Sequence, residues 1–566
     1  MRRPAGIRHG LDDRPPAAVM VATGAQQTTV VVLFLYVPLL VAREAQASVA
    51  QTVTLVGMTF LACGLGTMVQ ALRRHGLGCG FLAPISPATP YLAPSMLAAH
   101  IGGLPLMAGM TLAAGLATML LARGLNRVRA LMPPEIAGAV VLIVGLAVAV
   151  TGVRTLLRGP DGGPPAGADV LVGLLTLALA VGLSVWGRGV LRWACVLIAM
   201  AVGTALAAAL GRLHQAADLD LAAMPWVGVP AVGSIGLAFE WALLPAFLVA
   251  AVASSLKTVG LVTGLQKLND ADWTRPEPRS LAGGVMGDGI ATALAGLLGG
   301  PGVNMSPSNA ALQAATGVTS RVIALATGGL CIAMACFPRL AAMLSQVPGP
   351  VIAATLLLAG GLMMAAGMQL ATSRLMDTRR SAAVGLAVVA ALSVEVVPQM
   401  AFWVPNGLRP LMTAGAIGTL AAIVLNALLR IGIRRQMSIS HVAPEMTSEV
   451  VAAFLERAGG AWGLRADLVA RTVHSLTWCM EAIMVADLAR GPVTLAVGYD
   501  EAKVDVRLSY AGRGVTLAER PPTPDEMLSD DDAPARLAGH MIRRLTDRVA
   551  VRERDGVVEL RMVLND

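Results

Sequence analysis

Lys257 lies inside a stretch that carries no other charge, WALLPAFLVAAVASSLKTVGLVTGLQ at residues 241–266. A run of this length can cross a bilayer as a helix, and an ammonium group inside it is costly unless it faces a partner or a wet cavity. A lysine near a helix end can instead extend to the headgroups. About nine residues, roughly 13 Å, separate Lys257 from the end of this run, which is too far for that. We therefore interpret Lys257 as a candidate binding residue.

The composition indicates the class of protein to which this lysine belongs. The chain has 566 residues, of which 55% are hydrophobic and 14% charged, and its mean hydropathy is +0.68. Apolar runs recur along it, which predicts a polytopic α-helical membrane protein and excludes a soluble enzyme. The six cysteines form no metal-ligand or disulfide spacing, so we expect no metal, no cofactor and no catalytic residue. The net charge of +8 lies on short loops, which indicates membrane topology rather than nucleic-acid binding.

Fourteen membrane spans are predicted. They are centred near residues 30, 59, 90, 113, 144, 178, 202, 254, 290, 310, 331, 361, 389 and 422. Two of them are poor helices, because residues 80–99 contain four prolines and residues 299–317 are short and rich in glycine and proline. Irregular backbone at membrane depth persists where it is buried in protein or lines a cavity. Two such segments in corresponding halves indicate a transporter's binding site.

The two halves of the predicted membrane region correspond in sequence. One offset aligns Pro134 with Pro350 and Gly145 with Gly361, and Ser86-Pro87 matches Ser306-Pro307 in the same way. Seven spans per half is an odd number, so the halves must have opposite orientations in the membrane. The sequence therefore predicts a 7+7 inverted repeat.

Loop charges predict the orientation and the domain limits. Most Lys and Arg residues between the spans fall on one side, which is the inner side if the N-terminal segment, residues 1–17, is cytoplasmic. Both termini are then cytoplasmic, and the protein lies in a bacterial-type inner membrane. The membrane domain covers residues 18–436. Residues 437–566 alternate charged and apolar positions and predict a small soluble α/β domain.

Several blocks of the membrane region carry a family resemblance. They include GAQQTTVVVLFLYVPLLVA, GFLAPISP, SSLKTVGLVTGLQK, GGVMGDGIATALAGLLGG and SNAALQAATGVTSR. From about residue 18 to 400 the chain resembles the nucleobase–ascorbate transporter family, also called nucleobase:cation symporter-2, which includes xanthine and uracil permeases. The resemblance implies a core domain of spans 1–4 and 8–11 and a gate domain of spans 5–7 and 12–14. It also implies a substrate site between two half-helices in spans 3 and 10, and a homodimer through the gate.

The same resemblance suggests which residues surround the ligand or a coupling ion. They are Gln26, Gln27, Thr89, Lys257, Asp288, Ser308 and Asn309. Three positions depart from the family pattern. Gln26-Gln27 stands where the family usually has Gln-His, Lys257 where it has a carboxylate, and Ser308 where it has Gln or Glu. These departures put coupling to H⁺ or Na⁺ in question.

Lys257 leaves several chemical roles open. It has three donors and no acceptor, so it cannot replace a carboxylate. It can bind carbonyl oxygens or an organic anion, pair with Asp288, stand in for a coupling cation, or carry a proton itself. The other candidates also have structural interpretations. Ser308 and Asn309 can cap a helix, Gln26 and Gln27 can join helices, and Asp288 can lie near a membrane boundary.

The C-terminal region more weakly resembles the histidine-kinase-like (GHKL) ATPase fold in its anti-sigma form. Ser475 and Cys479 stand where that family places a Glu and a metal-holding Asn, which favours a module that binds a cytoplasmic protein partner without catalysis. For the whole chain we predict a secondary transporter of a nucleobase or a related oxopurine such as xanthine, urate or uracil. The alternatives are a transporter-fold sensor that signals through the C-terminal domain and an organic-anion transporter.

Overall fold

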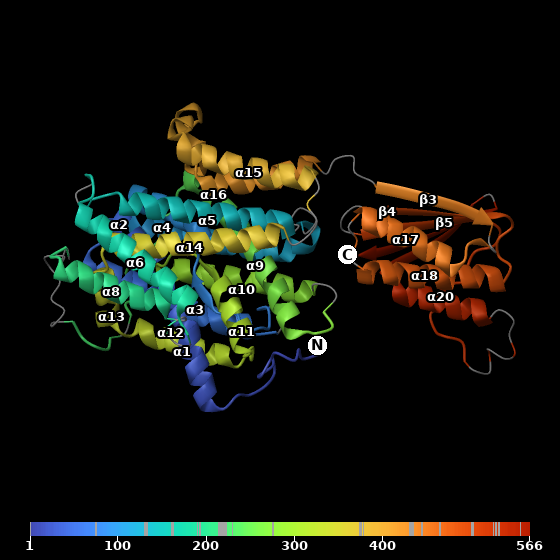
Figure 1. Ribbon diagram of the computed structural model, residues 1–566, viewed down its shortest axis with the longest axis horizontal. Helices are drawn as coiled ribbons and strands as arrows, with labels where there is room; N and C mark the ends of the chain where they lie inside the picture. Colours follow the sequence, from blue (N-terminus) through green and yellow to red (C-terminus); the bar gives the residue numbers. More distant parts are fainter. Residues whose placement is uncertain are drawn as a thin grey trace. The chain divides into compact units, whose positions relative to one another are not determined.

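The computed structural model divides the chain into two compact units, Met1–Leu429 (unit 1) and Arg430–Asp566 (unit 2). The residues that it describes are 2–73, 76–128, 134–159, 163–188, 191, 194–212, 224–228, 230–273, 277–372, 376, 378–429, 435–442, 445–462, 464, 466–499, 503–523, 526, 529, 533–554 and 556–565. Unit 1 is built from helices and unit 2 from a sheet with helices (Figure 1).

Unit 1 contains mostly long apolar helices. They are α1 (Ala17–Leu33), α2 (Tyr36–Glu44), α3 (Val49–Ala71), α4 (Leu92–Val128), α5 (Pro134–Leu156), α6 (Gly167–Trp186), α8 (Cys195–Ala209), α9 (Leu244–Asn269), α10 (Pro278–Leu298), α11 (Pro307–Thr316), α12 (Ile323–Ala335), α13 (Pro338–Ser345), α14 (Gly349–Ala371), α15 (Thr378–Val396) and α16 (Ala414–Leu429). Within the described ranges, eight helices are long and apolar enough to cross a membrane, or nine if the bent pair α12 and α13 is one span.

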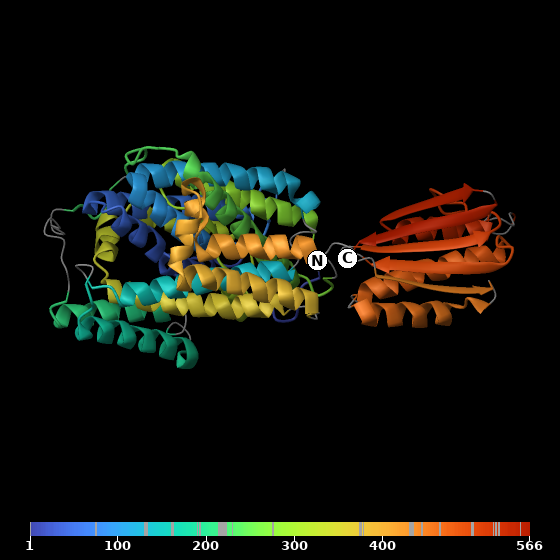
Figure 2. The same ribbon diagram turned by 90° about the horizontal axis from the view of Figure 1, so that it is seen from above.

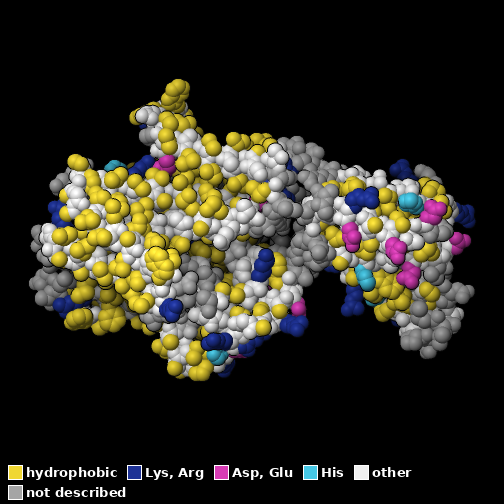
Figure 3. Space-filling model, viewed as in Figure 1, with side chains coloured by type: hydrophobic (Ala, Val, Ile, Leu, Met, Phe, Trp, Pro, Cys, Tyr) yellow, Lys and Arg dark blue, Asp and Glu magenta, His cyan; other side chains and the backbone are white. Residues whose placement is uncertain are grey.

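The surface of unit 1 suits a lipid environment. Large apolar side chains such as Leu120, Trp186 and Val389 are exposed, and hydrophobic atoms cover much of the face that Figure 3 shows. A soluble protein rarely exposes so much contiguous apolar surface. The prediction of a helical polytopic membrane protein is confirmed. Every predicted span centre falls in a helix, including the short ones, but the number fourteen stays a prediction.

The two segments expected to be interrupted are indeed not continuous helices. Strand β1 (Ile85–Pro87) precedes the short 3-10 helix η1 (Thr89–Tyr91) and the start of α4, and strand β2 (Val303–Met305) precedes α11. The two strands pair antiparallel, with Ser86 opposite Asn304. Because each strand satisfies the other's backbone, irregular chain can exist inside the unit. The α4 helix is broken at Gly103, whose φ of 69° lies in the left-handed region.

Helices α5 and α14 pack at unusually close range. A Cβ added to Gly138 of α5 would lie 2.2 Å from the backbone of Ala371 in α14, and one on Gly367 would lie 2.4 Å from Leu142. Small residues at such crossings let the backbones approach. The order of these contacts makes α5 and α14 antiparallel, as opposite orientations of the two halves require.

Helix packing in unit 1 follows two groups. The extensive pairs α4–α10, α3–α12 and α1–α12 join helices of the predicted core, and α5–α14, α15–α16 and α6–α14 join helices of the predicted gate. Smaller contacts, such as α5–α9, connect the groups. This pattern supports the division into core and gate, which stays a prediction.

Unit 2 is a five-stranded antiparallel sheet with helices on one face (Figure 2). The strand order is β3 (Arg435–Val442), β4 (Pro492–Tyr499), β5 (Lys503–Ala511), β7 (Val557–Asn565) and β6 (Arg548–Arg554). The helices are α17 (Ser448–Trp462), α18 (Ala466–Val485) and α20 (Ala533–Leu545). Every residue of its hydrophobic core comes from unit 2 itself. The unit thus has a core of its own, and its predicted α/β class is confirmed.

Candidate functional site

Asp288 of α10 is held by hydrogen bonds from two other helices. The Gln70 Nε2 of α3 donates to its Oδ1 at 2.8 Å, and the hydroxyl of Thr258 in α9 donates to its Oδ2. The Gln70 Nε2 also donates to the carbonyl of Gly284, and the Gln70 Oε1 accepts a hydrogen bond from the backbone N–H of Cys79. Asp288 is therefore not a boundary residue but the acceptor that joins three helices.

Lys257 of α9 points to the strand pair. Its Nζ donates to the Oδ1 of Asn304 at 2.6 Å, and the Asn304 Nδ2 donates to the hydroxyl of Ser254 at 2.7 Å. Among the described residues no ion pair within 4 Å joins Lys257 to Asp288, although the two charges interact through space. We call Gln70, Ser254, Lys257, Thr258, Asp288 and Asn304 the paired cluster. Within the described chain only one of the three Lys257 donors has a partner, which leaves two for a ligand.

Two other predicted residues are buried without partners. Both polar atoms of the Gln27 and Asn309 side chains lack a hydrogen bond in the described part of the chain, and so does the Ser306 hydroxyl. Gln27 is 0% exposed and Asn309 1%. We call Gln27, Ser306 and Asn309 the unpaired set. Since a buried polar group without a partner costs about 1–3 kcal/mol, such a set calls for a ligand or water.

The unpaired set and the paired cluster lie on touching elements. The α11 helix, which carries Asn309, packs against α1 and α9, which carry Gln27 and Lys257. Ser306 is the N-cap residue of α11, but its side chain makes no capping hydrogen bond, and Pro307 occupies the first turn of the helix. Neither Ser308 nor Asn309 is the N-cap residue, so a capping role does not explain them.

Thr89 lines a different space, a cavity of about 1460 Å³ between helices of the two packing groups. The residues of α9 on its wall end at Ala253, and Lys257 follows one helical turn later on the same face, about 5–6 Å deeper. The Thr89 hydroxyl contacts the Met363 Sδ of α14 at 3.6 Å. The described cavity therefore reaches Thr89 and stops about one turn before Lys257. It is not lined by Gln26, Gln27, Asp288, Ser308 or Asn309.

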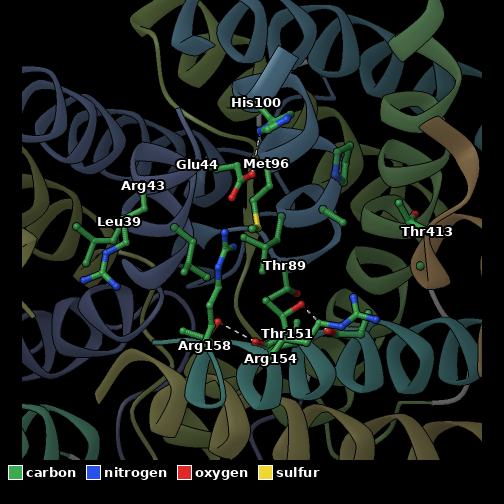
Figure 4. Close-up of a pocket in the computed structure, with 18 of the residues that line it drawn as sticks. Leu39, Arg43, Glu44, Thr89, Met96, His100, Thr151, Arg154, Arg158 and Thr413 are labelled. Carbon is green, nitrogen blue, oxygen red and sulfur yellow. Dashed lines mark hydrogen bonds and ion pairs between the residues drawn. The ribbon is translucent and has the colours of Figure 1, made fainter. Parts of the chain in front are cut away.

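The wall of this cavity is rich in arginine (Figure 4). Arg43 donates to the Val347 carbonyl at 2.5 Å, which links α2 to the segment before α14. Arg154 pairs with Glu395 at 2.7 Å, and His100 approaches Glu44 at 3.1 Å. Within the described chain Arg43 and Arg158 have no carboxylate partner. They make the cavity attractive to anions.

Sequence reasoning missed four of the six residues of the paired cluster. Gln70, Ser254 and Asn304 were not selected, although each is a polar residue in an apolar segment. Thr258 directly follows Lys257 and was also missed. Gln26 was selected and is half-buried on α1, next to the fully buried Gln27. The signal that could have found the missed residues is the one used for Lys257, a polar side chain far from the ends of a span.

The C-terminal positions that resemble a nucleotide site face inward. Cys479 of α18 is buried and its Sγ lies 3.8 Å from the Met562 Sδ of β7. The Ser475 hydroxyl donates to the Arg471 carbonyl of its own helix. Neither side chain is placed to hold a metal or phosphate. No group of three or more His, Cys, Asp or Glu side chains suited to a metal occurs among the described residues.

Known proteins resemble this chain over most of unit 1. Uric acid permease PucJ of Bacillus subtilis is 26% identical over 413 residues, which cover 71% of this chain and 90% of PucJ. Xanthine permease XanP of Escherichia coli is 26% identical over 433 residues, 74% of this chain and 93% of XanP. The transmembrane domain of a cyanobacterium bicarbonate transporter, BicA, gives a TM-score of 0.47 at 14% identity, with 72% of this chain and 96% of that chain covered. Residues 19–453 match the Permease family, and the chain is a member of that family.

Proposed function

We propose that this permease carries an oxopurine nucleobase, such as xanthine or urate, or the related pyrimidine uracil, across the membrane. The observation that carries the proposal is the buried unpaired set on α1, on α11 and at the start of α11, where α11 packs against the helix that carries Lys257. The names of two relatives, a uric acid permease and a xanthine permease, point to the same substrate class.

The chemistry of these side chains matches the edge of such a ring. An oxopurine presents N–H donors next to carbonyl acceptors, and each carboxamide offers one acceptor and two donors. Gln27 and Asn309 can therefore bind a ring edge as amide side chains bind base edges in nucleic acids. Lys257 adds donors for a carbonyl oxygen or for a deprotonated ring nitrogen. With Lys257, the site is better suited to an anionic oxopurine than a site that has a carboxylate at position 257.

The arginine-lined cavity fits the role of an entry path. If the N-terminus is cytoplasmic, the ends of α2 and α5 and the start of α14 lie at the outer side, and all three contribute to the cavity wall. The cavity then opens outward and ends near Thr89. Movement of the core domain against the gate domain would carry the substrate beyond Thr89. Such a movement must break or change the hydrogen bond from Arg43 to the Val347 carbonyl.

The finer topology belongs to this proposal. Fourteen spans, cytoplasmic termini, an inner-membrane location and a homodimer through the gate are what the loop charges and the resemblance support. Asp288 is committed to Gln70 and Thr258, so of the two charged residues it is Lys257 that keeps donors without a partner in the described chain.

The test is uptake of labelled xanthine, urate and uracil into vesicles that contain the purified chain, with and without H⁺ and Na⁺ gradients. We expect saturable uptake of at least one of them, and loss of that uptake in Asn309→Ala. Absence of both binding and uptake for all three compounds would contradict the substrate class.

A sensor is the second candidate, because unit 2 has a separate core and no role in the path described. Saturable binding without uptake under any gradient, together with binding of a cytoplasmic protein partner to unit 2 that depends on the nucleobase, would favour the sensor over the transporter.

A further inference from the structure

The sheet of unit 2 has one face without helices. Strand alternation sends Val504, Val506 and Leu508 of β5 into the core, so the neighbouring residues point to the other face. Several outward positions on β3 and β4 are small, including Ser438, Thr494, Ala496 and Gly498. They leave this face flat. We call it the open face.

Charges on the open face are strongly biased. Its outward cations are Lys503, Arg507, Arg548, Arg552, Arg554 and Arg561, and its carboxylates are Asp505 and Glu559. The Arg561 guanidinium binds Asp505 through two hydrogen bonds of 2.8 and 2.6 Å. Six cations thus face two carboxylates, one of which is already bound. Lys503, Arg548 and Arg561 also line a depression at the β6 edge.

The helices on the other side of the sheet do not share this bias. The sequences of α17, α18 and α20 together contain four Asp or Glu residues and five Arg residues, so their charges nearly balance. The strong positive bias therefore belongs to the open face, and a unit with one basic face turns that face toward a negatively charged surface.

Unit 2 follows the last apolar helix of unit 1 after a short connection. The family membership places unit 1 in a membrane, and α16 is one of its apolar helices. Five residues, 430–434, lie between Leu429 at the end of α16 and Arg435 at the start of β3. Fully extended, six residue steps span about 20 Å. Two of the five connecting residues, Arg430 and Arg434, are basic.

We propose that the open face of unit 2 is a docking surface for anionic lipid headgroups of the membrane that holds unit 1. Basic residues near an anionic leaflet attract it, and the attraction falls off within a Debye length. The flat array of small side chains lets the arginines reach phosphates without an obstructing ridge. The proposal does not depend on the transported substrate, so failure of either leaves the other standing.

The experiment uses residues 430–566, whose hydrophobic core is complete without unit 1. Co-sedimentation with vesicles of phosphatidylcholine alone is compared with vesicles that also contain phosphatidylglycerol, at low and high salt. We expect binding to the anionic vesicles only, and weakening by salt. The double variant Arg548→Gln/Arg552→Gln should bind roughly thirtyfold more weakly, because each arginine contributes about one factor of five.

The matched control is Arg543→Gln/Arg544→Gln, which removes the same charge from exposed positions of α20 on the helical face. It should bind like the unchanged unit. Thermal melting of both variants shows that each is folded. Equal loss in the two variants, or equal binding to neutral and anionic vesicles, would overturn the proposal. So would a stable dimer that Arg548→Gln/Arg552→Gln abolishes while vesicle binding is absent, since the open face would then bind a second copy.

Discussion

The paired cluster and the unpaired set lie on neighbouring elements of unit 1 but treat their polar atoms in opposite ways. In the paired cluster, Asp288 accepts hydrogen bonds on both oxygens, from Gln70 and Thr258, and the Asn304 side chain uses both of its groups. In the unpaired set, Gln27 and Asn309 have no partners among the described residues. Burial is nearly complete in both.

This difference separates two reasons for keeping polar residues inside a membrane protein. A satisfied network holds helices in place and is expensive to break. An unsatisfied buried group costs free energy in the empty protein, and the cost is recovered when a ligand binds it. The paired cluster should therefore act mainly on stability, with Lys257 as its link to the ligand. The unpaired set should act mainly on binding.

The largest effect is expected at Asp288. Asp288→Ala removes the acceptor that Gln70 and Thr258 share and leaves them only the backbone carbonyls of Gly284 and Ser254. Two buried hydrogen bonds to a carboxylate are lost, which costs about 3–6 kcal/mol. This loss of stability is measured by heating the protein in detergent and monitoring the fraction that remains monodisperse. Asp288→Asn keeps one acceptor oxygen and should lose less. If Asp288→Ala melts like the unchanged protein but no longer binds substrate, Asp288 acts in binding rather than in stability. The distinction between the paired cluster and the unpaired set is then wrong.

The next effect is expected at Asn309. Asn309→Ala removes groups that have no partner in the empty protein, so the melting temperature should hardly change. It should weaken nucleobase binding roughly 10- to 100-fold, because one or two hydrogen bonds of about 1–2 kcal/mol are lost. Equilibrium binding of labelled xanthine and urate measures this effect.

Asn269→Ala is the matched control for Asn309→Ala. Asn269 is also buried, but its Nδ2 donates to the Leu265 carbonyl at 2.9 Å. This variant should lower stability and leave binding unchanged. A stability loss in Asn309→Ala as large as that in Asn269→Ala would mean that the Asn309 side chain is paired in the protein, contrary to its place in the unpaired set.

The sequence predicts the elements better than the contacts between them. Hydropathy predicts the positions of the apolar helices, and prolines predict the two interrupted segments, because both signals are local. The antiparallel pairing of β1 with β2 joins segments from the two halves of the chain, so a local signal cannot predict it. The partners of Asp288 come from residues 70 and 258. No local pattern links such distant positions.

The same limit applies to the site. Lys257 is predicted because a charge inside an apolar span is rare, whereas Gln27, Asp288 and Asn309 are predicted from the family resemblance. Asn304 was passed over because it looks like an ordinary residue of a Gly- and Pro-rich segment. Its role depends on the strand that places it beside Lys257. Whether a polar residue is paired or unpaired is a property of the fold and cannot be read from its type.

A smaller effect is expected at Lys257, which belongs to the paired cluster but has donors to spare. Lys257→Gln keeps a hydrogen-bonding group beside Asn304 and removes the charge. We expect roughly five- to tenfold weaker binding of urate as its anion, about 1 kcal/mol, and little change for uncharged uracil. Lys257→Glu should abolish the preference for the anion altogether. Competition between urate and uracil at fixed pH measures the preference, and an unchanged preference in Lys257→Glu would remove Lys257 from the site.

The smallest effect is expected at Asp505 on the open face, which serves as the surface counterpart of Asp288. Two hydrogen bonds from Arg561, together with Arg507, hold the pKa of the Asp505 carboxyl below its usual value. Because this pKa is lowered in the folded unit, the pair stabilises it above the unfolded pKa of about 3.9, and the contribution is lost as the pH falls through the folded value.

Asp505→Asn should therefore destabilise residues 430–566 at neutral pH and have no effect well below pH 4. Since both partners are solvent-accessible, the loss is about 0.5 kcal/mol or less. Thermal melting across this pH range measures it. Asp288 and Asp505 each accept hydrogen bonds from two side chains, so the ratio of their effects isolates the contribution of burial. Equal effects would mean that the paired cluster is no more important for stability than an ion pair on the surface.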